Sequence, residues 1–211
     1  IKDMKYCFGV DVGGTTVKLG LFQTDSTLLD KWEIITRKET KEDVILPDIA
    51  QAIENKMIEH GILKEDVIGI GIGVPAAVKE GSFVKKVANL GWEYKNVKKE
   101  LEEMTGLYVC VENDANVAAL GEMWKGGGVG YNNMIMVTLG TGVGGGIILN
   151  GTILAGTNGG AGEIGHILAN RNETECCGCG KKGCLEQYAS ATGIARLAKN
   201  ILAENTCDTI L

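Results

Sequence analysis

The sequence has few prolines, few histidines and no long apolar run. Its 211 residues include two prolines and two histidines, and no segment approaches the ~18 consecutive apolar residues that a membrane span needs. Residues 1–5 carry no apolar signal segment. We therefore expect a protein that neither enters a membrane nor is secreted, and we place it in the cytoplasm.

Basic residues are in the minority. Lysine and arginine number 21 against 27 aspartates and glutamates, which gives a net charge of −6. A nucleic-acid surface needs clustered basic residues, so we expect no nucleic-acid partner. Apolar residues make up 45% and charged residues 23%, a balance typical of a soluble enzyme. A chain of 211 residues has room for one large domain or two small ones.

Glycine is abundant, with 31 residues gathered in clusters between apolar segments. Glycine lets the backbone turn tightly and approach a ligand closely. The seven cysteines could form a disulfide framework, but an odd number without a secretion signal fits a reducing cytoplasm better.

Cysteine and histidine gather in one part of the chain. Cys177, Cys179 and Cys184 lie within eight residues, and His166 lies shortly upstream. Thiolate and imidazole are preferred ligands of zinc, and a Cys₃His set closes a tetrahedral structural site. Cys176 adjoins Cys177, and the spacing alone does not choose between them. Disulfides and buried thiols are the alternatives.

Glycines and carboxylates surround these candidate ligands. Gly178, Gly180 and Gly183 would let a short loop curl so that three sulfurs face one point. Glu163 and Glu186 mark the two ends of the region. A zinc ion here would act as a staple that holds the two carboxylates close together, and such a pair of acceptors suits a polyhydroxylated ligand.

Hydrophobic periodicity predicts alternating strands and helices. Strands are expected over residues 6–12, 16–22, 27–35, 67–74, 108–111, 134–139 and 143–149, and helices over 41–60, 96–105, 114–124 and from 192 onward. The first three strands should form a β-meander, and the strand at 67–74 is apolar enough to be buried on both faces. Two strand pairs are joined by Gly/Thr turns, which suggests two related lobes with a hinge near 113–116.

The two Gly/Thr turns, at residues 13–15 and 140–142, expose backbone N–H groups and a hydroxyl, which is what a phosphate oxygen needs. Neither turn is followed by the Gly-Lys-Ser/Thr of a Walker loop. One such turn alone would more often be an ordinary hairpin. Two matched copies favour a pair of phosphate-binding turns.

Polar side chains gather where a predicted strand gives way to a helix, in the sequence Glu-Asn-Asp-Ala-Asn at 112–116. Asp114 alone would be predicted to be a helix N-cap. With Asn113 beside it, the carboxylate is placed to accept a hydroxyl proton while the amide fixes the alcohol. Asn89 is a weaker candidate for ligand contact, because an isolated asparagine is typical of a turn. The lysines at 85–86 are assigned to a solvated face.

Taken together, these motifs resemble the ROK family (repressors, open reading frames and sugar kinases), and within it the bacterial glucokinase branch. The segments that carry the resemblance extend along nearly the whole chain, at residues 11–15, 89–92, 112–116, 121–126, 139–146, 163–166 and 177–186. The resemblance implies an α/β, actin/hexokinase-like (ribonuclease H-like) two-lobed ATPase fold. Residues 1–113 would form the N-terminal α/β lobe, and residues 114–211 the first part of the larger C-terminal lobe, including the zinc loop.

The family's chains continue beyond the equivalent of Leu211, so the second lobe is expected to be incomplete. Such a chain would be a fragment or would have impaired ATP binding. Its unpaired lobe should expose apolar surface, which favours association or marginal stability.

The resemblance also implies roles for individual residues in a glucokinase. Asp114 would be the general base that deprotonates the 6-hydroxyl of glucose for attack on the γ-phosphate of MgATP. The sugar-binding positions would be Asn89, Asn113, Glu163, His166 and Glu186. The phosphate-binding positions would be Gly13, Gly14, Thr15, Gly140, Thr141 and Gly142, with Asp11 near the magnesium. Structural zinc would be held by His166, Cys177, Cys179 and Cys184, and not by Cys176.

The expected cofactors are thus ATP, Mg²⁺ and structural Zn²⁺, and the expected assembly is a homo-oligomer, a dimer or a tetramer. An N-acetylmannosamine kinase or a fructokinase of the same family is an alternative, and the sequence does not show whether ATP or polyphosphate is the donor. A sugar-responsive repressor is the rival from another class. Repressors of the family carry a winged helix before the first strand, whereas ten residues precede Asp11 here. A non-catalytic, zinc-stabilised sugar-binding module is the third possibility.

Overall fold

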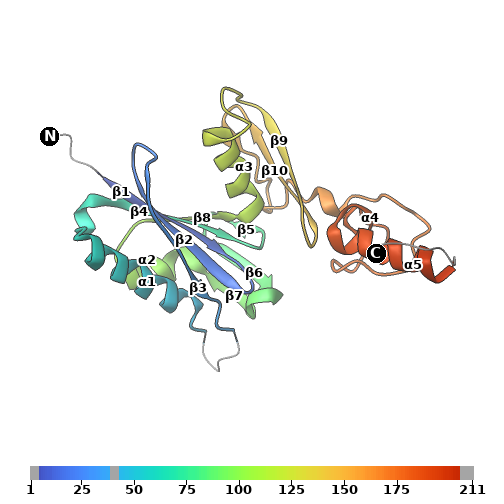
Figure 1. Ribbon diagram of the computed structural model, residues 1–211, viewed down its shortest axis with the longest axis horizontal. Coiled ribbons are helices and arrows are strands. Elements are labelled where there is room, and N and C mark those ends of the chain that lie inside the picture. Colours follow the sequence, from blue (N-terminus) through green and yellow to red (C-terminus); the bar gives the residue numbers. More distant parts are fainter. Residues whose placement is uncertain (1–4, 39–42, 205–211) are drawn as a thin grey trace. The chain divides into compact units, whose positions relative to one another are not determined.

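The computed structural model describes residues 5–38 and 43–204 (Figure 1). The chain forms two compact units, Ile1–Val117 and Ala118–Leu211, called here the N-terminal and the C-terminal unit. The lobe boundary expected after residue 113, and the hinge expected near 113–116, stay predictions.

A five-stranded sheet is the centre of the N-terminal unit (Figure 1). Its strands are β1 (Tyr6–Val12), β2 (Thr16–Gln23), β3 (Leu28–Ile35), β4 (Val67–Val74) and β8 (Val109–Asn113), in the order β3-β2-β1-β4-β8. The first three pair antiparallel, which confirms the predicted β-meander. Strand β4 pairs parallel with both β1 and β8, so the carboxyl ends of β1, β4 and β8 lie at one edge of the sheet, where ligands commonly bind in α/β proteins.

Two helices, α1 (Ile45–His60) and α2 (Val97–Thr105), lie together on one face of this sheet (Figure 1). They bury an apolar stripe on it, as their 3.6-residue periodicity predicts. The side chains that form this core include Phe8, Val10, Leu19, Leu21, Leu46, Ile49, Ile53, Ile70, Ile72 and Leu101. The helix expected to start at residue 41 begins at Ile45, and residues 41–42 lie outside the described part of the chain.

Strand β4 is buried on both faces only in part. Its Ile70, Ile72 and Val74 belong to the core under α1 and α2, but Gly71 is exposed and Ile68 is 56% exposed. The prediction is therefore wrong for these two positions. Gly71 has no side chain to bury, and Ile68 lies at the register shift where β1 and β4 begin to pair.

A small sheet that the sequence did not predict follows β4. It consists of β5 (Val78–Lys79), β6 (Phe83–Val87) and β7 (Trp92–Asn96), in that order. Two adjacent lysines interrupt the apolar alternation of β6, and both are exposed as expected. The short helical turn Ala88–Leu90 connects β6 to β7 and carries Asn89.

The C-terminal unit contains a second sheet, with the order β11-β10-β9. Its strands are β9 (Met134–Leu139), β10 (Val143–Leu149) and β11 (Thr152–Ile153), and its helices are α4 (Glu186–Ala189) and α5 (Ala191–Glu204). Helix α3 (Asp114–Lys125) begins in the N-terminal unit and continues into this one. The helix expected from residue 192 corresponds to α5, while residues 205–211 lie outside the described part.

Strand β9 exposes apolar side chains, as expected for this unit. Ile135 and Leu139 are each 66% exposed and Val137 is 49% exposed. None of the helices in the described part of the chain has the length and apolar character that a bilayer span requires.

Candidate active site

The first Gly/Thr turn connects β1 to β2 and is held by the end of β3. The amide of Gly13 donates to the Thr16 carbonyl at 3.0 Å, which closes the turn. The hydroxyl of Thr36 donates to the Gly13 carbonyl at 2.7 Å, and its amide donates to the Thr15 carbonyl at 2.9 Å. Asp11, the last but one residue of β1, is exposed beside this turn.

Strand β8 ends at Asn113, and α3 starts at Asp114. The Oδ1 atom of Asn113 accepts hydrogen bonds from the amides of Ala115 at 3.0 Å and Asn116 at 3.2 Å. The capping role considered for Asp114 therefore belongs to Asn113. The Nδ2 atom of Asn113 donates to the Ala76 carbonyl at 3.3 Å.

The Oδ1 atom of Asp114 accepts a hydrogen bond from the amide of Ala115 at 2.8 Å. Burial raises the pKa of Asp114, and the nearby carboxylate of Asp11 raises it further, while the Ala115 amide opposes the change. Two carboxylates with mutual influence thus lie at the carboxyl edge of the sheet. Asn89 belongs to the same region, since a methyl group on Gly14 would lie 3.5 Å from its Cβ.

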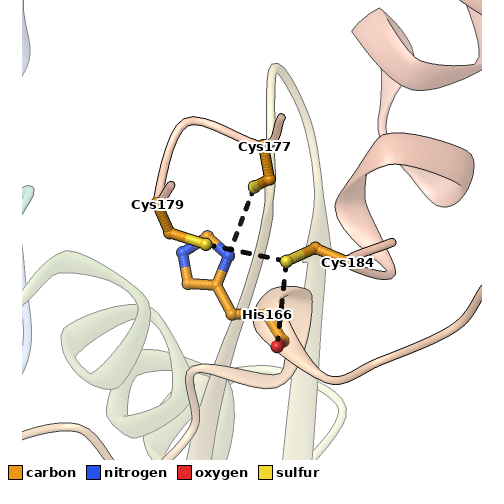
Figure 2. Close-up of side chains that lie close together, drawn as sticks. All are labelled: His166, Cys177, Cys179 and Cys184. Atoms are coloured by element: carbon orange, nitrogen blue, oxygen red, sulfur yellow. Dashed lines mark hydrogen bonds between the residues drawn. The ribbon is translucent and has the colours of Figure 1, made fainter. Parts of the chain in front are cut away.

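The predicted zinc ligands lie together in the C-terminal unit, and their side chains point toward one another (Figure 2). One ligand atom from each of His166, Cys177, Cys179 and Cys184 lies within 4.8 Å of all the others. The sulfurs of Cys179 and Cys184 are 3.6 Å apart, and the Cys177 sulfur is 3.8 Å from Nδ1 of His166. Ligands at zinc bonding distances of ~2.3 and ~2.1 Å in a tetrahedron would be spaced by about 3.6–3.8 Å.

The donor set fits zinc better than a disulfide. All four ligands are of the types that zinc prefers, and the three cysteines are free thiols at separations far beyond the ~2.05 Å of a sulfur–sulfur bond. Cys176 is exposed and does not belong to the cluster. The loop curls through positive φ angles at Gly180 and Gly183, whereas Gly178 does not adopt such an angle.

The two carboxylates at the ends of this region flank one imidazole. Glu163 Oε2 lies 3.8 Å from Nε2 of His166, and Glu186 Oε1 lies 3.7 Å from Nδ1 of the same ring. The thiol of Cys177 donates to Glu186 Oε1 at 2.8 Å. The expected proximity of the two carboxylates is therefore present in the structure.

Close backbone packing positions these carboxylates. A methyl group on Gly165 would lie 2.1 Å from the Val143 carbonyl, so the segment from Glu163 to His166 can approach β10 only with glycine there. Glu186 opens α4, and its Oε2 lies 2.8 Å from where a methyl group on Gly142 would be. The second Gly/Thr turn therefore lies directly against Glu186.

The start of α5 anchors the second Gly/Thr turn. The amide of Ala191 donates to the Gly140 carbonyl at 2.9 Å, and the hydroxyl of Thr192 donates to the Thr141 carbonyl at 2.6 Å. Both Gly/Thr turns are therefore tight hairpins whose carbonyls are engaged by neighbouring segments.

Sequence reasoning missed a polar network next to the cysteine loop, residues 177–184. The Tyr188 hydroxyl donates to Glu173 at 2.5 Å, and Arg196 donates to the same carboxylate at 2.9 Å. Arg196 also pairs with Glu175 at 3.1 Å. These residues are distant in sequence and belong to no recognisable motif, so only the folded chain brings them together. The network ties the loop to α4 and α5.

A second group with metal-binding geometry, Asp30, Glu59 and His60, lies on the N-terminal unit. The ammonium of Lys56 lies 2.7 Å from both Asp30 Oδ2 and Glu59 Oε2. This lysine already supplies the positive charge that the carboxylates need, so the group is an ion-pair network between α1 and β3.

Known proteins of one family match this chain along nearly its whole length. The ROK family model matches residues 7–211. A glucokinase of Halalkalibacterium halodurans is 50% identical over 202 residues, which cover 95% of this chain and 61% of that protein. The chain therefore spans 61% of the length of this curated relative.

Two solved structures extend the comparison. A ROK family glucokinase from Streptomyces griseus, in complex with glucose and AMPPNP, is 35% identical with a TM-score of 0.74, over 96% of this chain and 62% of that one. A ROK family transcriptional regulator is 26% identical with a TM-score of 0.84, over 96% of this chain and 51% of that one. The predicted actin/hexokinase-like α/β fold is confirmed, and the chain belongs to the ROK family.

Proposed function

We propose that this chain acts as an ATP-dependent hexokinase that phosphorylates the 6-hydroxyl of glucose. The observation that carries the proposal is Asp114, a carboxylate at the carboxyl edge of the sheet whose pKa is raised by desolvation and by the nearby Asp11, close to the first Gly/Thr turn. Two relatives also support the proposal: a glucokinase that is 50% identical to this chain, and a similar glucokinase solved with glucose and AMPPNP.

In the proposed step Asp114 accepts the proton of the 6-hydroxyl. The hydroxyl oxygen forms a bond to the γ-phosphorus of ATP, the bond from that phosphorus to the bridging oxygen breaks, and ADP leaves with the electron pair. A raised pKa makes the Asp114 carboxylate a stronger proton acceptor. Positioning and charge neutralisation supply most of the catalysis in such transfers.

The N-terminal unit would handle the phosphate end of the reaction. The Gly13 amide closes the turn, so the amides of Gly14 and Thr15 would bind phosphate oxygens. Asp11 would hold Mg²⁺, which prefers oxygen ligands and neutralises phosphate charge when bound. The second turn, Gly140 to Gly142, is the matching candidate on the C-terminal unit.

The C-terminal unit would recognise the sugar. Glu163 and Glu186 can accept hydrogen bonds from sugar hydroxyls, and His166 lies between them. Zinc at His166 and the three thiolates would fix this arrangement as a structural cross-link. Because a metal-bound thiolate has no proton to donate, zinc binding would release Glu186 Oε1 from Cys177 for a ligand. The family resemblance assigns Asn113 and Asn89 to sugar binding as well, and these roles belong to the proposal.

The remaining parts of the proposal are a cytoplasmic location, a homo-oligomeric assembly and the absence of a nucleic-acid partner. The free cysteines among the described residues support the location, and the acidic net charge of −6 supports the absence of a nucleic-acid partner. A non-catalytic, sugar-responsive regulator is the second candidate, because the transcriptional regulator matches with a TM-score of 0.84.

ADP release tests the proposal, measured with MgATP and a panel of glucose, mannose, fructose and N-acetylmannosamine. We expect turnover to peak on glucose. The Asp114→Asn variant should lose turnover by about 10²-fold or more and still bind glucose in calorimetry. Glucose binding without turnover in the wild-type chain would favour the regulator, and retained turnover in the variant would contradict the assignment of the base.

A further inference from the structure

The segment after β3 is fixed against the first Gly/Thr turn. Thr36 bonds both Gly13 and Thr15, as described above, and is itself buried. The next residue, Arg37, donates through Nε to Asp48 on α1 at 2.8 Å. The backbone leading to Lys38 is thus anchored to the turn on one side and to α1 on the other.

Lys38 directs its ammonium group toward the turn. A methyl group built on Gly14 would lie 3.8 Å from the Lys38 Nζ atom and 3.5 Å from the Cβ of Asn89. A methyl group here would therefore project between the Lys38 ammonium and Asn89 and contact both at ordinary van der Waals distances. The absent side chain of Gly14 keeps this space open.

A phosphoryl group at this turn would need a nearby cation to offset the negative charge of the carboxylates around it. Asp11 and Asp114 place two carboxylates at this edge of the sheet, and both would repel a phosphoryl group. Arg37 is already neutralised by Asp48. Lys38 forms no ion pair with any carboxylate in the described part of the chain, so its charge remains available to an anion.

The amides of the turn have unequal roles. Gly13 donates to Thr16 within the turn, whereas the Gly14 amide has no hydrogen-bond partner among the described residues. A free N–H beside a free ammonium is a typical pair of donors for a phosphate oxygen.

We propose that Lys38 is a phosphate-contacting residue of the kinase reaction, whose ammonium binds the phosphoryl group seated at Gly14 beside Asn89. The inference rests on the proposed function, and Lys38 lies outside the sequence motifs described above. The shared ligand chemistry is a terminal phosphate, which can belong to the phosphoanhydride donor before transfer or to the sugar phosphate after it.

Binding of inorganic tripolyphosphate to the ¹⁵N-labelled chain tests the contact directly, through the amide resonances of Gly13 and Gly14. The Lys38→Ala variant should bind about tenfold more weakly, as loss of one charge-assisted hydrogen bond implies. Lys38→Arg should restore most of the affinity. The control is Lys31→Ala, which removes an exposed lysine from the middle of β3, opposite Gly20.

Substitution of each glycine in turn separates two effects on phosphate binding: filling the space beside Gly14, and distorting the turn at Gly13. Gly14→Ala should weaken tripolyphosphate binding without unfolding, because its methyl group meets no atom closer than 3.5 Å. Gly13→Ala should distort the turn, because its methyl group would lie 2.7 Å from the Thr16 carbonyl. A parallel titration with glucose 6-phosphate shows whether Lys38 also contacts the phosphate after transfer.

The outcomes distinguish this inference from the proposed function. Equal tripolyphosphate affinity in Lys38→Ala and the wild type, or no perturbation of the turn amides in the wild type, would overturn the role of Lys38 whether or not the chain is a kinase. Lysine-dependent tripolyphosphate binding without turnover of any hexose would support the contact and contradict the kinase.

Discussion

At the scale of single residues, neighbouring polar groups take different roles because their surroundings differ. Asn113 and Asp114 are adjacent, but the helix amides at Ala115 and Asn116 bond to Asn113. The Asp114 carboxyl lies near Asp11, and desolvation together with this like charge raises its pKa. The capping arrangement thus frees the carboxylate for chemistry, a distinction that residue types alone do not reveal.

The influence of Asp11 on Asp114 is testable by titration. Asp11→Asn removes a like charge, so the pKa of Asp114 should fall toward the ordinary value of ~3.9. Since the base works only when ionised, the acid limb of kcat/KM should move to lower pH in the variant. Side-chain ¹³C NMR of Asp114 measures the pKa independently of activity.

Asp66→Asn is the matched control, because Asp66 pairs with Lys5 at 3.1 Å, away from the site residues. It should leave the titration of Asp114 unchanged. An unaltered pKa of Asp114 in Asp11→Asn would show that the two carboxylates do not interact.

Glu173 shows the opposite effect on a carboxylate. The Tyr188 hydroxyl, the Glu175 amide and Arg196 together lower the pKa of Glu173 to about 2. A lowered pKa in the folded state contributes stability that is present above the unfolded value of ~4.3 and is lost as the pH falls toward the folded value. The melting temperature of the wild type should therefore fall more steeply between pH 4.5 and 2 than that of Glu173→Gln.

A control for Glu173 is Glu103→Gln, which removes an exposed partner of Lys99 at 3.8 Å. This variant should follow the wild-type dependence of melting temperature on pH. Parallel curves for Glu173→Gln and the wild type would mean that the network does not stabilise the folded state through this carboxylate.

At the scale of elements, predictability from sequence follows the strength of the local pattern. Strands β1, β9 and β10 match their predicted bounds, because each is a clear apolar run that ends at a glycine turn. Strands β5 to β7 were missed, since β5 has two residues and two lysines interrupt β6. Their stability comes from packing of Val84, Val87 and Trp92 into the core, which only the tertiary structure provides.

The site was predictable to the extent that it lies in motifs. Chemistry and spacing grouped His166 with the cysteines, and the choice of Cys177 over Cys176 needed the family resemblance. The structure brings these four side chains together, and zinc binding stays a prediction. Lys38 and Glu173 escaped prediction because single lysines and glutamates carry no local signal. Their positions depend on contacts with residues far away in the sequence.

The proposed zinc site predicts different effects for the substitution of Cys176 and of Cys179. Zinc analysis of protein purified without added metal should find about one atom per chain, as a Cys₃His site implies. Cys176→Ser should keep the metal because Cys176 is exposed outside the cluster. Cys179→Ser should lose most of it. Zinc loss in Cys176→Ser, or active wild-type protein without zinc, would contradict the assigned ligand set.

At the scale of the whole molecule, the chain carries the family's motifs while spanning 61% of the length of a curated relative. Within the described residues β9 is an edge strand, paired on one side with β10. It combines an open row of backbone groups with exposed Ile135, Val137 and Leu139. Such an edge is a template for pairing with another chain.

We therefore expect the 211-residue chain to self-associate in a concentration-dependent manner, measured as molar mass by light scattering. Val137→Lys places a charge in the middle of the β9 edge and should shift the distribution toward the monomer, because a lysine on an edge strand opposes pairing. Ile58→Lys is the control, since Ile58 is 74% exposed on helix α1 rather than on a strand edge. Equal association of both variants would assign the interaction to a different surface. A monomeric wild type at all concentrations would show that the exposed strand is tolerated in solution.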